Sequence, residues 1–380
     1  MPANAEELAE DLRRWSMHER TIRLEGGGSK RLMAGPVEEA DESVSIAPLN
    51  RVLEYEPYDL TISVEAGLPW RDLTKLLAEH RQMIPLDPPL AERATVGGVI
   101  AANSSGPRRR LYGTARDMVI GMTFVTLEGK LVQSGGMVVK NVAGLDMAKL
   151  MIGSFGTLAA IAVVNFKLTP MPQAERTCLL PFDSAAAAIA ARAKICEGAL
   201  QPSAIDLLNP AAAEIAGHGG WLLAVRAAGN AAVTARFQRE AAVLASGPVL
   251  DGEAQDDFWR RIQEFTPDFL ASHPEGAVAR VSCTLKETAA AMEAFEGPAL
   301  ARAGTGVCYG YWEQAEALAP WIAERAALGW KAVVEWAPEA RKRELDLWPA
   351  PGGDFGLMQR VKSLFDPGNV LNRGRLYGRI

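Results

Sequence analysis

The sequence predicts an α+β protein with more than one domain, and three observations lead to this prediction. The chain has 380 residues, of which 48% are hydrophobic and 23% charged; this ordinary globular composition supplies more than one core. Short β-rich runs alternate with amphipathic helices along the chain. Residues 90–160 hold 11 glycines and the longer segment 171–345 holds 13. We therefore expect a glycine-rich domain beside a domain that packs helices on one face of a sheet.

The first domain is expected to cover residues 1–170 and to open with a helix. Leu8, Leu12 and Trp15 share one face at helical spacing. A second helix is expected after Pro69, with Leu73, Leu76 and Leu77 on its buried face. The strands expected in this domain are residues 21–24, 60–64, 83–86, 119–127, 131–133 and 161–168.

Two closely spaced prolines in residues 169–173 predict a domain boundary, because proline ends regular structure. Residues 171–345 are then expected to form an α+β cap domain in which strands precede helices. The tail, residues 346–380, regains glycine and is expected to return to the first domain. The elements expected in the cap are strands 178–182, 205–208, 221–227, 278–284 and 306–311, and helices 184–197, 231–245, 286–296 and 313–328.

Charge and residue usage exclude several classes of protein. A net charge of −6 provides no field for nucleic acid, and no run reaches the roughly 18 apolar residues of a membrane span. The acidic N-terminus does not resemble a signal peptide. Four scattered cysteines and four dispersed histidines show no metal-ligand spacing, so no metal site is expected and the cysteines are expected to be core residues. We expect a cytoplasmic protein that reaches the inner face of a membrane only through partners.

Glycine-rich loops are the strongest functional signal in the sequence. Residues 25–30 read Glu-Gly-Gly-Gly-Ser-Lys after a predicted strand, and such a loop can point several backbone amides at an anion. The alternative is a flexible turn between strands, since neither the Rossmann nor the Walker A pattern is present. Residues 94–106 then contain almost no bulky side chain. Three further loops, 113–117, 140–146 and 153–157, complete a set that fits an extended cofactor lying along the domain.

These loops, in this order, resemble the vanillyl-alcohol-oxidase or PCMH-type family of FAD-binding proteins. The resemblance implies an FAD-binding domain of two α/β subdomains with an inserted α+β cap. It rests on GGGSK (26–30), SVEAGLPWRDL (63–73), PLDPP (85–89), ATVGGVIAANSSG (94–106), YGTARDMV (112–119), KNVAGLDMAKLMIGSFGTLAAI (140–161) and DPGNVLNRGRL (366–376).

The resemblance also implies which residues hold the cofactor. Ser29 stands where relatives with covalent flavin often carry histidine, so the FAD is expected to be non-covalent. Lys30 has a second interpretation as a solvated loop cation, and Asp117 a second interpretation as a local ion pair with Arg116. The implied cofactor-binding residues are Gly26, Gly27, Gly28, Ser29, Lys30, Pro88, Thr95, Gly97, Gly98, Ala102, Asn103, Gly106, Gly113, Asp117 and Ile161.

Within the family, the KNVAGLD and DPGNVLN runs resemble the FAD-binding subunits of glycolate oxidase. This implies an electron-transferring subunit of a 2-hydroxy-acid dehydrogenase complex, with a catalytic flavoprotein and an iron–sulfur protein as partners. The chain lacks the H-x-G-D-G-N-x-H motif of the hydroxy-acid-oxidising relatives, so no catalytic residue is assigned. Two alternatives are a self-sufficient flavin oxidoreductase and a flavin-free assembly subunit. The tail reads Asn372-Arg-Gly-Arg375 instead of the family's N-P-G-K, which places any role of Asn372 or Arg375 in doubt.

Overall fold

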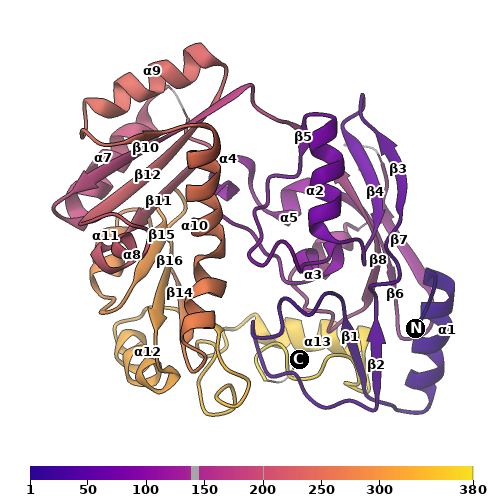
Figure 1. Cartoon of the computed structure of the whole chain (residues 1–380). Helices are drawn as coiled ribbons and strands as arrows, with labels where there is room; N and C mark the ends of the chain where they lie inside the picture. Colours follow the sequence, from indigo (N-terminus) through magenta and orange to yellow (C-terminus); the bar gives the residue numbers. More distant parts are fainter. Residues whose placement is uncertain (138–144, 200, 379) are drawn as a thin grey trace. The chain divides into compact units, whose positions relative to one another are not determined.

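The computed structural model describes residues 1–137, 145–199, 201–378 and 380. The chain divides into two compact units, which are described separately here (Figure 1). Unit 1 comprises residues 1–105, 113–171 and 350–380, and unit 2 comprises residues 106–112 and 172–349. Residues 106–112 thus differ from the expected assignment to the first domain, because they pack with unit 2. None of the helices in the described residues has both the length and the apolar composition of a membrane span.

Unit 1 is built on a five-stranded antiparallel sheet in the order β3-β4-β8-β6-β7. All five residues of β4 are buried, and so are most residues of the seven-residue strand β6 and the eight-residue strand β8. The hairpin at Glu128-Gly129 joins β6 and β7, as the sequence predicts. The strands are β3 (Val52–Glu56), β4 (Thr61–Glu65), β6 (Val119–Val125), β7 (Leu131–Gly135) and β8 (Ala160–Lys167).

Helices α1 (Ala5–Met17) and α2 (Trp70–Glu79) form where the apolar spacing predicts them. The Asn4 side chain caps α1 by accepting a hydrogen bond from the Glu7 amide at 2.8 Å. Pro69 precedes the first turn of α2 with φ −58°, a backbone angle already suited to a helix start. Leu8 and Leu12 of α1 are fully buried. Unit 1 also contains β5 (Gln82–Met83), β9 (Thr169–Pro170), α3 (Val96–Ala101), α5 (Ala115–Met118) and α6 (Ala148–Met151).

The C-terminal tail is part of unit 1. Strands β1 (Ile22–Glu25) and β2 (Glu42–Ser45) pair in parallel. On the other edge of β1, the Ile22 amide donates to the Val370 carbonyl at 2.8 Å and the Asn372 amide donates to the Ile22 carbonyl at 2.9 Å. The tail therefore extends the β1–β2 ribbon, and helix α13 (Phe355–Phe365) leads into it. More than 300 residues of sequence separate β1 from this part of the tail.

Unit 2 is an eight-stranded antiparallel sheet in the order β13-β10-β12-β11-β15-β16-β14-β17. Alternate residues of its strands form an apolar core with helices α7, α9, α11 and α12 on one face of the sheet. The strands are β10 (Ala174–Phe182), β11 (Ala204–Leu208), β12 (Trp221–Gly229), β13 (Val249–Leu250), β14 (Ala277–Ser282), β15 (Ala299–Arg302), β16 (Val307–Trp312) and β17 (Ala332–Trp336). The helices are α4 (Arg109–Tyr112), α7 (Ala185–Glu197), α8 (Pro210–Ile215), α9 (Ala231–Ala242), α11 (Thr288–Glu293), η1 (Ala315–Ala317) and α12 (Leu318–Ala327).

The long helix α10 (Gly252–Ser272) is not among the predicted elements, and it packs on the other face of this sheet. On β10, Cys178 belongs to the helix-covered core, so its neighbour Thr177 points to the opposite face. There Thr177 accepts a hydrogen bond from the Trp259 indole of α10 at 2.7 Å. The apolar face of α10 includes Phe258, Ile262 and Phe265, which explains why it covers a sheet despite Pro267 inside it. Helices therefore lie on both faces of the sheet, with most of them on one.

Candidate functional site

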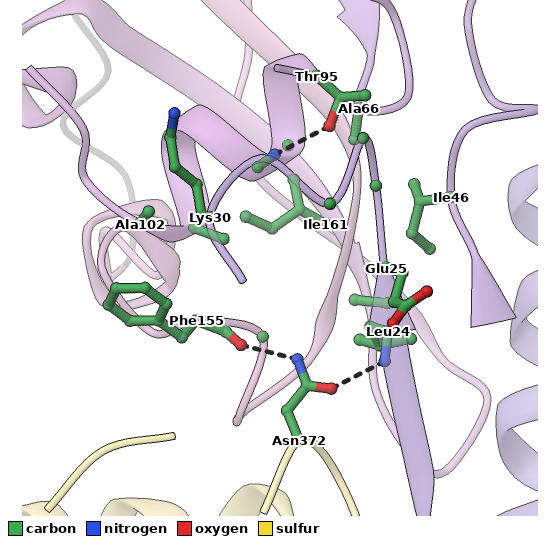
Figure 2. A pocket seen from close by; sticks show the side chains of 18 of the residues that line it. Leu24, Glu25, Lys30, Ile46, Ala66, Thr95, Ala102, Phe155, Ile161 and Asn372 are labelled. Atoms are coloured by element: carbon green, nitrogen blue, oxygen red, sulfur yellow. Dashed lines mark hydrogen bonds between the residues drawn. The ribbon is translucent and has the colours of Figure 1, made fainter. Parts of the chain in front are cut away.

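A cavity of about 220 Å³ lies within unit 1. It is bounded by the loop after β1, the start of α3, the loop before β8 and the C-terminal tail (Figure 2). Its lining residues are Arg23, Leu24, Glu25, Gly26, Gly27, Gly28, Ser29, Lys30, Arg31, Val37, Ile46, Ala66, Thr95, Gly97, Gly98, Ala101, Ala102, Phe155, Gly156, Ala159, Ala160, Ile161, Asn372 and Arg375. Three of the five glycine-rich loops therefore meet around one space.

Two different constraints favour glycine in the first loop, close approach at Gly27 and a left-handed backbone at Gly28. A Cβ on Gly27 would lie 2.0 Å from the Arg93 carbonyl oxygen, and Gly28 has a φ of +66°. Nothing lies within 4 Å of the place where a Gly28 Cβ would be. In the part of the chain that the structure describes, the amides of residues 26–29 donate no hydrogen bond. The loop thus offers consecutive N–H groups to an anion in the cavity.

Helix α3 brings the second small-residue segment to the cavity. The Thr95 side chain caps α3 by accepting a hydrogen bond from the Gly98 amide at 3.3 Å (Figure 2). The Gly97 amide donates to the Ala66 carbonyl at 2.6 Å, and a Cβ on Gly97 would lie 2.9 Å from the Ala66 Cβ. Small residues are therefore needed for α3 to rest against the end of β4. The sequence predicted an open backbone here, and the structure folds residues 96–101 of this segment into a helix.

The loop before β8 is fastened to the C-terminal end of α3. The Gly153 amide donates to the Ile100 carbonyl at 3.2 Å, and the Phe155 amide donates to the Ala101 carbonyl at 2.9 Å. These bonds satisfy carbonyl groups that a helix leaves without partners at its end. Ile161 then enters the cavity wall from β8. These hydrogen bonds hold the loop before β8 against the end of α3, although about fifty residues separate them in the sequence.

Asn372 and Arg375, whose roles the sequence placed in doubt, both line the cavity. The Asn372 side chain accepts a hydrogen bond from the Leu24 amide and donates one to the Phe155 carbonyl, each at 2.8 Å (Figure 2). It therefore joins β1 to the loop before β8. Arg375 donates to the carbonyls of Lys30 at 3.1 Å and of Gly35 at 2.8 Å. The tail thus holds the glycine loop in place, even though the tail motif at residues 372–375 departs from the family pattern.

A buried ion pair anchors the tail within unit 1. Lys362 of α13 lies 2.6 Å from the Asp366 carboxylate and also donates to the Thr157 carbonyl at 2.8 Å and the Leu371 carbonyl at 3.2 Å. Asp366 in turn accepts hydrogen bonds from the amides of Val370 and Leu371. Burial lowers the pKa of Lys362, and the hydrogen bond to Asp366 opposes that shift. Every charge in this cluster is compensated, so the cluster fixes the tail without serving as a ligand site.

The cavity wall is positively charged on balance. Arg23, Lys30, Arg31 and Arg375 line it together with a single acid, Glu25, which pairs with Arg23 at 2.8 Å. Lys30 is only 7% exposed and donates to the Pro89 carbonyl. This finding contradicts the interpretation of Lys30 as a solvated loop cation. Cations and free amides beside a small apolar surface suit a ligand that combines phosphates with flat rings.

Other predicted site residues lie outside this cavity. Pro88 is buried next to the carbonyl that accepts from Lys30, and Asn103 follows α3 with a φ of +47°. Gly106 belongs to unit 2. Of the fourth loop, residues 140–144 lie outside the described residues, so the structure does not describe the KNVAG part of that motif.

The third loop forms a capped turn and does not line the cavity. Asp117 accepts hydrogen bonds from the Thr114 amide at 2.8 Å and its hydroxyl at 3.3 Å, which forms a capping box at α5. Gly113 has a φ of +86°, and a Cβ there would meet the Asp117 carboxylate at 2.3 Å. Arg116 donates instead to the Lys149 carbonyl at 2.8 Å. The alternative of an Arg116–Asp117 ion pair is therefore wrong, since Asp117 holds the turn.

Several lining residues were not predicted from the sequence. Phe155 and Gly156 lie in a loop that was recognised as small-residue-rich, so their signal was available. Ala66 directly follows the buried strand β4, and Ala101 belongs to the second small-residue segment. Val37 and Ile46 carry no sequence signal, because only the β1–β2 pairing brings them to the cavity.

Matches to known protein families agree with this geometry. Residues 1–135 match the model of an FAD binding domain, and residues 349–376 match the C-terminal domain of FAD linked oxidases. These two segments contain the glycine loop, helix α3 and the tail that together bound the cavity. The two matched segments are therefore similar to the FAD-binding proteins that the loop order predicted, and they support FAD as the cofactor.

Three proteins of known name share sequence similarity with parts of this chain. The chain is 36% identical over 152 residues to the glycolate oxidase subunit GlcE of Escherichia coli (strain K12), which covers 40% of this chain and 43% of the relative. It is 30% identical over 208 residues to the glycolate oxidase subunit GlcD of Bacillus subtilis (strain 168), covering 55% of this chain and 44% of the relative. It is 32% identical over 185 residues to a D-2-hydroxyglutarate dehydrogenase of Xanthomonas citri pv. viticola, covering 48% and 39%. Each match spans less than half of the relative's length.

Solved structures share the fold over almost the whole chain. An alkyldihydroxyacetonephosphate synthase superposes with a TM-score of 0.72 at 19% identity, covering 98% of this chain and 74% of that one. A 4-ethylphenol oxidase from Gulosibacter chungangensis superposes with a TM-score of 0.72 at 14% identity, covering 100% and 88%. These similarities confirm the predicted α+β fold class.

Proposed function

We propose that this chain binds FAD non-covalently in the cavity of unit 1 and acts as the FAD-binding subunit of a 2-hydroxy-acid dehydrogenase complex of the glycolate oxidase kind. The observation that carries the proposal is the cavity itself, where the free amides of residues 26–29 face the space that Thr95, Phe155 and Asn372 also line. Bound FAD supplies the electron acceptor that protein side chains lack.

Each part of the cavity wall has a role in this proposal. The amides of residues 26–29 bind the diphosphate, and the charges of Lys30 and Arg375 neutralise it. The apolar stretch that includes Ala102 and Ile161 packs against a flat ring and excludes water from it. Pro88, Asn103, Gly106, Gly113 and Asp117 belong to the same proposed site by family resemblance, although they do not line this cavity.

Ser29 supports a non-covalent mode of binding, because its hydroxyl is not the imidazole that attaches flavin in relatives. The test is acid precipitation of the purified yellow protein. We expect the flavin absorbance to stay in the supernatant. Flavin that remains in the washed pellet would contradict the non-covalent proposal, and a colourless protein whose melting temperature does not respond to added FAD would contradict FAD binding as such.

A variant that fills the cavity tests its location. Ala101 lines the cavity and is partly exposed, so Ala101→Phe places a ring where we propose that FAD lies. We expect the variant to lose at least tenfold in FAD affinity while keeping a native far-ultraviolet circular dichroism spectrum. The matched control is Ala78→Phe on the exposed side of α2, outside the cavity. Equal FAD affinities in the two variants would place the cofactor elsewhere.

The subunit role draws on two relatives that are named as glycolate oxidase subunits. The chain also lacks the H-x-G-D-G-N-x-H motif. We therefore expect the isolated chain to contain flavin but to turn over glycolate or D-lactate slowly with an artificial electron acceptor. We further expect co-purification with a catalytic flavoprotein and an iron–sulfur protein at native expression levels. Rapid glycolate turnover by the isolated chain would refute the accessory role.

A self-sufficient oxidoreductase is the second candidate, and two buried arginines in unit 2 favour it. Arg302 is 8% exposed and pairs with Asp206, while Arg226 is 4% exposed and pairs with Glu175 at 2.6 Å. The Nε atoms of both arginines are buried, with no hydrogen-bond partner among the described residues. Such guanidinium groups suit a carboxylate substrate. If anaerobic addition of 2-hydroxy acids bleaches the flavin in the wild-type chain but not in Arg302→Met, this second function replaces the first.

A further inference from the structure

Two cysteines of unit 2 lie side by side although 25 positions separate them in the sequence. Cys308 is in β16, and Cys283 directly follows β14, the strand with which β16 pairs. The Cys283 amide donates to the Gly306 carbonyl at 2.9 Å, which continues the ladder beyond the strand. Because Val281 lies opposite Cys308, residue 283 points to the same face as residue 308. Their sulfur atoms are 3.9 Å apart.

The two thiols have unequal surroundings. Cys308 is fully buried in the core, whereas Cys283 is half-buried at the end of its strand. Hydrogen bonding from Cys308 lowers the pKa of Cys283 to about 7, with a smaller contribution from the Thr288 hydroxyl. The same contact and burial raise the pKa of Cys308 well above its ordinary value. Cys283 is therefore a solvent-accessible thiolate near neutral pH, and its neighbour Cys308 is a protonated thiol.

The remaining cysteines provide a contrast within the same unit. Cys178 is 2% exposed, and burial raises the pKa of its thiol. Neither Cys178 nor Cys196 has another cysteine sulfur in contact within the part of the chain that the structure describes. Among the four cysteines, only Cys283 is both partly exposed to solvent and in contact with a second cysteine sulfur. The expectation that all four cysteines are simple core residues therefore does not extend to Cys283.

We propose that Cys283 and Cys308 form a redox modification site that hydroperoxides convert reversibly to a disulfide. The Cys283 thiolate attacks one oxygen of hydrogen peroxide, the O–O bond breaks, hydroxide leaves, and Cys283 becomes a sulfenic acid. The Cys308 sulfur then attacks the Cys283 sulfur, its proton leaves with the sulfenic hydroxyl as water, and the S–S bond forms. The two sulfurs lose two electrons in total, and peroxide gains them.

The structure allows this bond with little rearrangement. The sulfurs must move from 3.9 Å to a bond length of about 2.05 Å. Cys283 can supply the movement by rotating its side chain, because it lies beyond the last residue of β14 and is half exposed. The strands are already paired, so the disulfide would close a short cross-strand link without separating them. A dithiol held in this way forms a bond that thiol reductants can reach from the Cys283 side.

The test treats the full chain with a small excess of hydrogen peroxide and follows intact mass, free thiols and peptide maps. We expect wild-type protein to lose two thiols and two hydrogen atoms, with a linked peptide containing Cys283 and Cys308, and to recover fully with dithiothreitol. Cys308→Ser is expected to stop at the sulfenic acid, which dimedone traps at Cys283. A double variant, Cys178→Ser with Cys196→Ser, is the control and is expected to behave as wild type. Oxidation of wild-type Cys283 to sulfinic acid without the linked peptide would overturn the proposal.

A second measurement tests the activation of Cys283 separately. The rate of alkylation by iodoacetamide, followed at Cys283 by mass spectrometry, is expected to rise with a midpoint near pH 7. Cys308→Ser keeps a hydrogen-bond donor and is expected to keep this midpoint. Cys308→Ala removes the donor and is expected to move the midpoint toward that of an ordinary thiol, about 8.5. A midpoint near 8.5 in the wild-type chain would overturn the assignment of Cys283 as the attacking thiolate.

Discussion

Replacement of Asn372 tests whether the tail builds the cavity. Its side chain makes two hydrogen bonds of 2.8 Å, to the Leu24 amide and the Phe155 carbonyl. At about 1 kcal/mol for each bond, their loss costs about 2 kcal/mol of folding free energy. Asn372 also has a φ of +42°, where alanine pays roughly 1 kcal/mol more than asparagine or glycine. We therefore expect Asn372→Ala to lower the free energy of unfolding of unit 1 by about 3 kcal/mol.

Two further substitutions at this position separate the contributions. Asn372→Gly loses both hydrogen bonds but tolerates the backbone angle, so we expect it to be about 1 kcal/mol more stable than Asn372→Ala. Asn372→Asp can still accept from Leu24 but cannot donate to Phe155, and we expect an intermediate loss. Urea unfolding followed by fluorescence measures all three variants, and titration with FAD measures affinity. Because both bonds hold backbone that lines the cavity, we expect about a tenfold weaker affinity for Asn372→Ala, equivalent to about 1.4 kcal/mol.

The reasoning would be refuted if Asn372→Ala unfolded within 0.5 kcal/mol of wild type, on the order of an ordinary surface substitution. It would also be refuted if the alanine and glycine variants bound FAD as tightly as wild type, because the tail would then be irrelevant to the cavity.

Three other substitutions probe the same site. Gly27→Ala forces a Cβ to within 2.0 Å of the Arg93 carbonyl oxygen. We expect this variant to lose about 1–3 kcal/mol of folding free energy and to retain little bound flavin after purification. The control Gly353→Ala, whose added Cβ meets nothing within 4 Å, should match wild type. Lys362→Met leaves the Asp366 carboxylate buried without its cation; thermal unfolding should report a loss of about 3–5 kcal/mol, while Arg360→Met on the exposed side of the same helix should change little. Arg375→Lys keeps the positive charge, but a lysine ammonium group cannot donate to several carbonyl groups as the guanidinium does. FAD titration should show roughly tenfold weaker binding, equivalent to about 1.4 kcal/mol. An unchanged affinity would exclude Arg375 as the support of the glycine loop.

Local sequence patterns predicted much of unit 1. Helices α1 and α2 form where apolar residues repeat at helical spacing, and the β6–β7 hairpin turns at its glycine. These elements depend on neighbours in the chain, so their signal is local. Leu76 is the exception on α2, since it is only partly buried where Leu73 and Leu77 are fully buried.

Helix α10 was missed because its amphipathic pattern is interrupted by Pro267, and proline inside a run argues against a helix. Tertiary packing overrides that local preference: Phe265 and Phe269 of α10 both pack their rings against Tyr311 of β16. The buried aromatic area compensates for one missing backbone hydrogen bond. The strand β15 was also missed, since four residues carry too short a pattern to distinguish from a loop.

The sequence by itself determined which segments of this protein could approach a cofactor, because stretches without bulky side chains are visible in any linear reading. The order of those stretches also predicted the resemblance to FAD-binding proteins that the family matches support. Only the tertiary structure decided which of them share one cavity, that Asn372 and Arg375 close it from the far end of the chain, and that two cysteines on neighbouring strands meet. The physical reason is that side-chain volume and periodicity are properties of neighbouring residues, whereas strand pairing and hydrogen bonds across hundreds of positions are set by the whole folded chain.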